Sequence, residues 1–138
     1  MVMIEGAAKA AARTLVRRVN RDNPSKQTGD VRTGSVRMFC RVDYLGAQSG
    51  FGGEVFSVSR YAKDRRDWDF NRQMTMYVVR DRSGMFAPLS FEERRGRRME
   101  YTPGYRLKGD TVEFLPGIQQ AMASVAAAWF PAILSHRR

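Results

Sequence analysis

Two arginine-rich stretches are the parts of this sequence whose residue types could do chemistry. The first covers residues 60–72 and mixes cations with aromatic and acidic side chains, and the second covers residues 92–98 and places arginines around Gly96. Guanidinium groups bind phosphate in a bidentate manner, and aromatic rings stack on bases. Such interleaving is typical of surfaces that bind single-stranded nucleic acid. The candidate binding residues are Arg60, Lys63, Arg65, Arg66, Trp68, Arg72, Arg94, Arg95, Arg97 and Arg98.

Each stretch also has a purely structural interpretation. Residues 60–72 could form a hairpin connection in which Trp68 and Phe70 lie under a sheet while the charges pair locally, and residues 92–98 could form a solvated loop. Three aspartates in residues 60–72 raise the possibility of a magnesium site, because carboxylates are ligands that Mg²⁺ prefers. These acids stand among five cations, so local ion pairing explains their presence better than a metal site does. We therefore expect no metal and no other cofactor. The acids in question are Asp64, Asp67 and Asp69.

The composition is that of one globular domain with a large positive charge. The chain has 138 residues, of which 43% are hydrophobic and 11% aromatic, so it can bury a core of ordinary size. A formal net charge of +10 indicates a polyanionic partner, either nucleic acid or an acidic protein surface. The basic residues are 20 Arg and 4 Lys, a bias that suits phosphate recognition and that GC-rich codons would also produce. This composition excludes an acidic tail, a collagen-like repeat and a disulfide scaffold.

No arrangement of residues in the sequence resembles a catalytic centre. Cys40 is the only cysteine and lies in an alternating apolar run, where a buried thiol is expected, and the only histidine is His136 near the end of the chain. No nucleophile has a base nearby and no zinc site has its ligands, so we expect a protein that is not an enzyme. No unbroken run of about 18 apolar residues predicts a membrane span, so no membrane partner is expected.

Helices are expected near both ends of the chain. Alanines together with Leu15 and Val16 favour a helix over residues 5–19, because alanine loses no side-chain entropy there. In the C-terminal segment, apolar residues recur at steps of three and four, which predicts an amphipathic helix that Pro131 should kink or end. The expected apolar stripe consists of Leu115, Ile118, Met122, Val125, Trp129 and Ile133.

The middle of the chain has the pattern of an antiparallel sheet. Residues 36–44 alternate apolar and polar side chains, which predicts a strand with one buried face, and a glycine-rich turn leads to a partner strand. A fourth strand is expected at an edge, because Pro88 cannot donate to a ladder. The further strands are expected over residues 55–61, 74–79 and 85–91, with weaker candidates over 99–102 and 105–107.

These elements predict an α+β fold: an antiparallel sheet of four or more strands with an N-terminal and a C-terminal helix. We expect a single domain over residues 1–138. Its parts would be an N-terminal helix over 1–20, a linker or loop over 21–34, the sheet over 35–109, and the C-terminal helix with a basic tail over 110–138. The linker is expected because residues 21–34 are rich in turn-forming residues and poor in apolar ones.

The central block resembles a small domain family of unknown function that plasmids and phages carry. The resemblance covers residues 35–134 and implies an accessory protein of a mobile element, with no established activity. The chain departs from the family pattern at the histidine, the Asn-Gly pair and the Asp-Pro pair, where it has Arg60, Asp67 and Gln73. The residues that carry the resemblance are those from 58 to 69, then Met74, Met76, Val78, Val79, Asp81, Gly84, Pro88, Leu89, Ser90 and Phe91, and a closing helix expected to bear Phe114 and Trp129.

Two functional hypotheses follow from these observations. The first is a non-enzymatic binding module that engages nucleic acid or a nucleoprotein through its arginine-rich loops. The second is a protein-binding factor, either an inhibitor of a host defence complex or a subunit of a virion or other large assembly. In that case the arginines would face acidic protein, and exposed apolar groups such as Trp68 or Phe86 would anchor the contact. Either protein would act in the host cytoplasm, or in the virion as a structural subunit.

Overall fold

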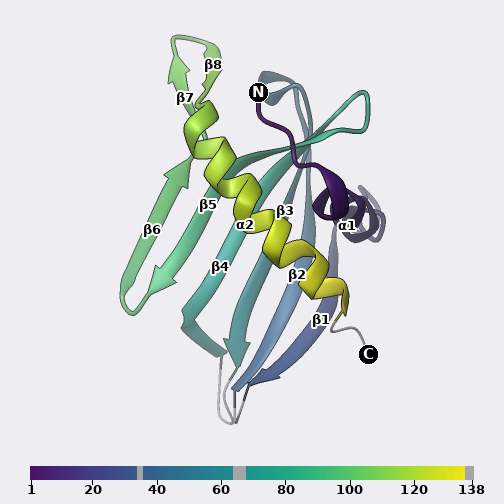
Figure 1. Cartoon of the computed structure of the whole chain (residues 1–138), viewed down its shortest axis with the longest axis vertical. Helices are drawn as coiled ribbons and strands as arrows, with labels where there is room; N and C mark the ends of the chain where they lie inside the picture. Colours follow the sequence, from purple (N-terminus) through teal and green to yellow (C-terminus); the bar gives the residue numbers. More distant parts are fainter. Residues whose placement is uncertain (34–35, 64–67, 136–138) are drawn as a thin grey trace.

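The chain folds into a six-stranded antiparallel sheet, with two helices on one of its faces and a separate two-stranded sheet at one end (Figure 1). The predicted α+β fold with an N-terminal and a C-terminal helix is thus confirmed. This computed structural model describes residues 1–33, 36–63 and 68–135, and within them all side chains except those of residues 29–33, 36–38, 62–63, 68–72 and 95.

The strands of the large sheet follow one another in chain order, so the sheet is a simple meander. The helices are α1 (Gly6–Val16) and α2 (Pro116–Ser135), and a short 3-10 helix, η1 (Ser49–Phe51), links β2 to β3. The strands of the large sheet are β1 (Ser25–Thr33), β2 (Val36–Gln48), β3 (Gly53–Lys63), β4 (Trp68–Asp81), β5 (Phe86–Arg95) and β6 (Arg98–Pro103). The small sheet consists of β7 (Tyr105–Lys108) and β8 (Thr111–Phe114).

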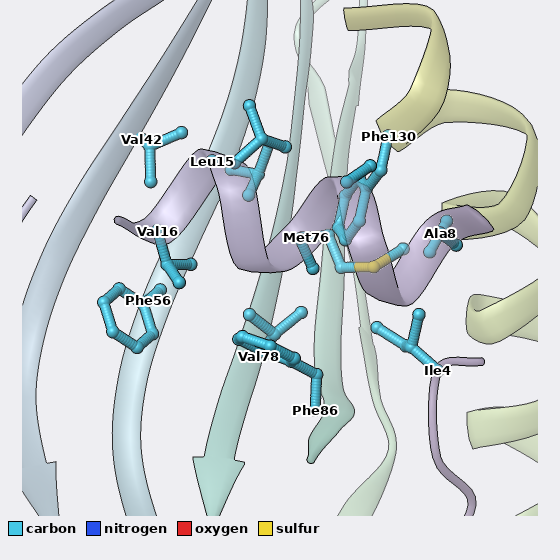
Figure 2. Close-up of a cluster of buried hydrophobic side chains, with 14 of the residues drawn as sticks. Ile4, Ala8, Leu15, Val16, Val42, Phe56, Met76, Val78, Phe86 and Phe130 are labelled. Carbon is cyan, nitrogen blue, oxygen red and sulfur yellow. The ribbon is translucent and has the colours of Figure 1, made fainter. Parts of the chain in front are cut away.

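The main hydrophobic core lies between the sheet and the two helices. Alanines on the inner side of α1 allow it to pack closely against α2 and the sheet. Cys40 belongs to this core with 2% of its surface exposed, and burial raises the pKa of its thiol to about 11 despite the nearby charge of Arg60. Figure 2 shows the core side chains Ile4, Ala8, Leu15, Val16, Val42, Phe56, Met76, Val78, Phe86 and Phe130.

The opposite face of the sheet, here called the open face, carries neither α1 nor α2, and the described residues cover it only at one end. A second apolar cluster lies there, formed by Val55, Val79, Ala87 and Leu89 of the sheet. Aromatic side chains from η1 and from the β7–β8 hairpin pack onto this cluster, and the rings of Phe51 and Tyr105 meet edge to face at 4.8 Å. The remainder of the open face lies beyond this cap.

The first strand occupies a segment that the composition assigned to a linker. The expected loop over residues 21–34 is wrong for Ser25–Thr33, which pairs with β2 over the full length of β1. As an edge strand, β1 is held by backbone pairing to one neighbour, so it needs little apolar patterning, and polar edges also discourage aggregation. A register shift between Gln27 and Gly29 adds a bulge to this edge.

The fourth strand lies inside the sheet and not at its edge. β5 pairs with β4 on one side and with β6 on the other, so the edge position inferred from Pro88 is wrong. Pro88 is tolerated because the register pairs β6 with β5 only from Ser90 onward, so Pro88 lies beyond that ladder, and the register with β4 also shifts next to it, between Tyr77 and Val78. Proline therefore marked a local break in the pairing of an inner strand.

The C-terminal helix is shorter than expected at its start and longer at its end. Residues 111–114 form β8, so α2 begins only at Pro116, and it continues through Pro131 to Ser135. Its buried side is also rotated relative to the expected stripe, because Val125 is 37% exposed and Gln119 is fully buried. The buried residues of α2 are Gln119, Met122, Ala126, Trp129, Phe130 and Ile133.

The length and composition of α2 would suffice to cross a membrane, with a mean hydropathy of 1.2. Among the described residues it is the one helix with this property. The sequence of α2 contains no unbroken apolar run of this length, because Gln119, Gln120 and Ser124 interrupt it. In this fold α2 is a core helix, since it packs against α1 and β5.

Candidate nucleic-acid interface

The meander brings the described parts of both arginine-rich stretches to one end of the sheet. Because consecutive strands are antiparallel, β1, β3 and β5 all end on the same side of the sheet, toward the bottom of Figure 1. We call this the basic end and define it by the described residues 30–33, 36–37, 60–63, 68–72 and 92–98. These segments hold nine of the 24 Lys and Arg residues and four of the 14 acids, so the basic end carries an excess of positive charge.

The predicted site residues of the first stretch are only partly placed. Arg65 and Arg66 lie outside the described residues. For Lys63, Trp68 and Arg72 the backbone is described: Lys63 pairs with Trp68 where β4 begins, and Arg72 lies in β4 itself. The sequence placed residues 60–72 in a loop between two strands, which is wrong for residues 60–63 at the end of β3 and for residues 68–72 in β4.

Arg60 lies on the helix-bearing face of the sheet. It stands between Cys40 and Met74 in the strand register, and its Nη2 atom lies 2.8 Å from the sulfur of Met74. Its Nε atom is buried and has no hydrogen-bond partner in the described part of the chain. Arg60 is therefore half-buried beside the core. The strand register places Arg94 of β5 on the opposite, open face.

The second stretch forms the β5–β6 hairpin and not the loop that was expected. Arg94 and Arg95 end β5, Arg98 begins β6, and the turn between them uses Gly96 with a φ of 63°, a conformation that favours glycine. Arg94 is half-buried, with an Nε atom that lacks a hydrogen-bond partner among the described residues. Arg97 and Arg98 are exposed. The hairpin thus presents guanidinium groups at the tip and on its sides.

The open face next to the basic end is lined by hydroxyl and aromatic groups. Ser59 and Thr75 are almost fully buried there, and their hydroxyl oxygens lie 3.0 Å apart. The rings of Phe39 and Tyr61 stack at 6.1 Å. One row of register partners across the face is Arg41, Ser59, Thr75, Glu92 and Tyr101, and the adjoining row is Asp43, Ser57, Tyr77, Ser90 and Pro103.

A hollow of about 410 Å³ opens on this face, between the polar rows and the cap formed by η1 and the β7–β8 hairpin. Its lining includes Tyr77, Tyr101, Tyr105, Phe51 and the carboxylate of Glu92. Burial raises the pKa of Tyr77, and the charge of Glu92 and a hydrogen bond to it add to this effect. A hydrogen bond with Tyr101 raises the pKa of Tyr105 to about 12. Both phenols therefore keep their protons at neutral pH.

Sequence reasoning missed the residues of this hollow. They come from six strands, β2 to β7, and from η1, and only the register shows that Tyr77, Ser90 and Glu92 share a face. One signal was present: residues 76–79 form a short run of consecutive apolar side chains, which indicates a strand covered on both faces. The two apolar residues expected to anchor a protein partner do not form an observed contact surface. Phe86 is fully buried, and the side chain of Trp68 lies outside the described part of the chain.

The fold defines a class: a two-layer α+β protein with two helices on one face of a six-stranded antiparallel meander. No protein-family model, curated protein or solved structure matches the chain.

Proposed function

We propose that this chain is a non-enzymatic binding module that engages nucleic acid, free or within a nucleoprotein, through the basic end. The observation that carries the proposal is that the strands which begin or end in the two arginine-rich stretches, β3 to β6, bring these stretches to the same end of the sheet. A cluster of like charges costs free energy unless an anion lies near, and arginine binds phosphate through two parallel hydrogen bonds. The resemblance to a plasmid and phage family supports a role as an accessory protein of a mobile element.

The opposite end of the sheet supports the proposal by contrast. There Arg80 donates to Glu54 at 2.8 Å, and Arg106 of β7 donates to Glu113 of β8 at the same distance. The positive charges of Arg80 and Arg106 are therefore balanced by carboxylates of the protein itself. Arg97 and Arg98 of the basic end are exposed, and an arginine of β5, Arg95, is the register partner of Arg98.

Substitution of the first stretch tests the proposal. We expect the wild-type chain to be retained on immobilised DNA and to elute late in a salt gradient, because phosphate contacts release counterions. If four phosphates are contacted on a duplex, the logarithm of affinity should fall with the logarithm of salt at a slope of about −3.6. The double variant Arg65→Ala, Arg66→Ala should elute at clearly lower salt.

An unchanged elution position of this double variant would remove residues 65 and 66 from the interface. Early elution of the wild-type chain itself would contradict the proposal as a whole. A pull-down from host extract with and without nuclease then distinguishes the protein-binding alternative. A protein captured in both conditions is bound directly, whereas one lost on nuclease treatment was bridged by nucleic acid.

A further inference from the structure

The hollow on the open face has the chemistry of a site for a flat, hydrogen-bonding ring. Its volume of about 410 Å³ lies within the range of about 300–1,000 Å³ that small-molecule sites occupy. Three tyrosines and Phe51 give it ring surfaces, and Tyr101 is half exposed at its rim. Glu92 supplies a carboxylate that accepts hydrogen bonds. Ring surfaces beside an acceptor suit a base that carries amino donors.

The hollow lies directly next to the basic end on the same face. Glu92 and Arg94 are two positions apart on β5, so their side chains point to the same side at a separation of about 7 Å along the strand. Tyr101 and Met99 are their register partners on β6. The carboxylate of Glu92 repels phosphate, whereas Arg94 attracts it. A single strand of nucleic acid that crosses this region would therefore place a base in the hollow and its phosphates next to the arginines.

We propose that the hollow is a base-binding subsite, so that the nucleic acid this chain binds is single-stranded and contributes an unstacked base with an amino group. The proposal rests on the proposed function and narrows its substrate class. A base within a duplex is stacked and paired, so it cannot reach between Tyr101 and Tyr77. Guanine, adenine and cytosine offer an exocyclic amino group to Glu92, whereas thymine and uracil offer only the N–H group of the ring.

Substitution of Tyr101 tests whether a base stacks on this ring. We expect Tyr101→Ala to weaken binding of a labelled single strand of about 12 nucleotides by about tenfold, the loss typical of one stacked base. Tyr101→Phe keeps the ring and removes only the 3.4 Å contact between its hydroxyl and that of Tyr105, so it should bind like the wild type. Fluorescence anisotropy gives both affinities, and circular dichroism checks that both variants are folded.

Substitution of Glu92 tests the hydrogen-bonding part. We expect the wild-type chain to bind an alternating cytosine–adenine strand several-fold more tightly than an all-thymine strand of equal length. Glu92→Gln should bring this ratio close to one, because an amide both donates and accepts. Glu100→Gln is the matched control: it removes the same charge from the neighbouring strand β6, where Glu100 is exposed and pairs with Glu93, and it should keep the wild-type ratio.

The outcomes separate this proposal from the one on which it rests. A single-strand preference that is lost with Tyr101→Ala, together with a base preference lost with Glu92→Gln, supports the base-binding subsite. Equal affinity for single strand and duplex, with Tyr101→Ala behaving as wild type, overturns the subsite while binding at the arginines stands. Failure of every nucleic-acid probe to bind overturns both proposals.

Discussion

Replacement of Arg97 and Arg98 with glutamine is expected to weaken binding of a single-stranded oligonucleotide about 25-fold at about 0.1 M salt. Each phosphate contact with a single strand contributes about 0.7 to the salt slope, so two lost contacts lower the association constant by about 10^1.4 at this salt. Both side chains are exposed, one in the turn after β5 and one at the start of β6, so the fold should not change. Fluorescence anisotropy at a fixed salt concentration measures the effect.

The matched control for this pair is Arg13→Gln with Arg17→Gln. These arginines are also exposed, and their removal changes the net charge by the same amount, but they lie on α1 and the residue after it. If affinity depended on net charge alone, both double variants would lose it equally. An equal loss would contradict binding at the basic end, and a loss confined to the Arg97 and Arg98 variant would support it.

Replacement of Gln119 with leucine is expected to lower the free energy of unfolding by about 2–4 kcal/mol. Gln119 is fully buried, its Oε1 accepts from the backbone N–H of Val2 at 3.0 Å, and its Nε2 donates to the carbonyl of Pro88 at 2.9 Å. The substitution leaves the part-buried N–H of Val2 and the buried carbonyl of Pro88 without these partners, and a buried polar group without a partner costs about 1–3 kcal/mol. Urea unfolding followed by circular dichroism measures the change.

The neighbouring residue provides the control for this substitution. Gln120 is exposed on the same helix, so Gln120→Leu changes the composition and helix propensity in the same way without touching the buried hydrogen bonds. It should leave the free energy of unfolding within about 0.5 kcal/mol of the wild type. Equal stability of the two variants would show that Gln119 does not hold the N-terminal segment, β5 and α2 together.

Alternation of apolar and polar residues located strands that have one apolar face. β2 and β3 were recognised because alternation reports a core on one side, and Cys40 and Val42 are indeed buried there. β1 was missed because it is an edge strand with a polar sequence. β5 was placed at an edge because a proline inside a regularly paired inner strand would leave a hydrogen bond unmade. The pairing around Pro88 is irregular, so an inner strand can hold this proline.

The position of α2 also depended on contacts that no periodicity reveals. The expected stripe used Val125, whereas the helix turns Gln119 inward because the backbone groups of Val2 and Pro88 need partners. Pro131 does not end the helix, since Phe130 and Ile133 on either side of it are buried in the core. Packing of these side chains outweighs the hydrogen bond that proline lacks.

The candidate site was foreseen in its residue types but not in its geometry. The arginines were identified from their clustering, yet their distribution over two faces follows from strand register, which placed Arg60 beside Cys40 and Arg94 beside Met99. The hollow could not be predicted, because it depends on the β7–β8 hairpin and η1 covering only one end of the open face.

The most direct test of the central claim is to map the bound strand on the protein. Backbone amide chemical shifts are recorded while a single strand of about 12 nucleotides is added. We predict that the changes cluster in the β3–β4 and β5–β6 connections and along the open face at Glu92, Arg94 and Tyr101, and that α1 and the tip of the β7–β8 hairpin stay unchanged. Changes confined to α1 or to β7 and β8, with the basic end unaffected, would contradict the claim.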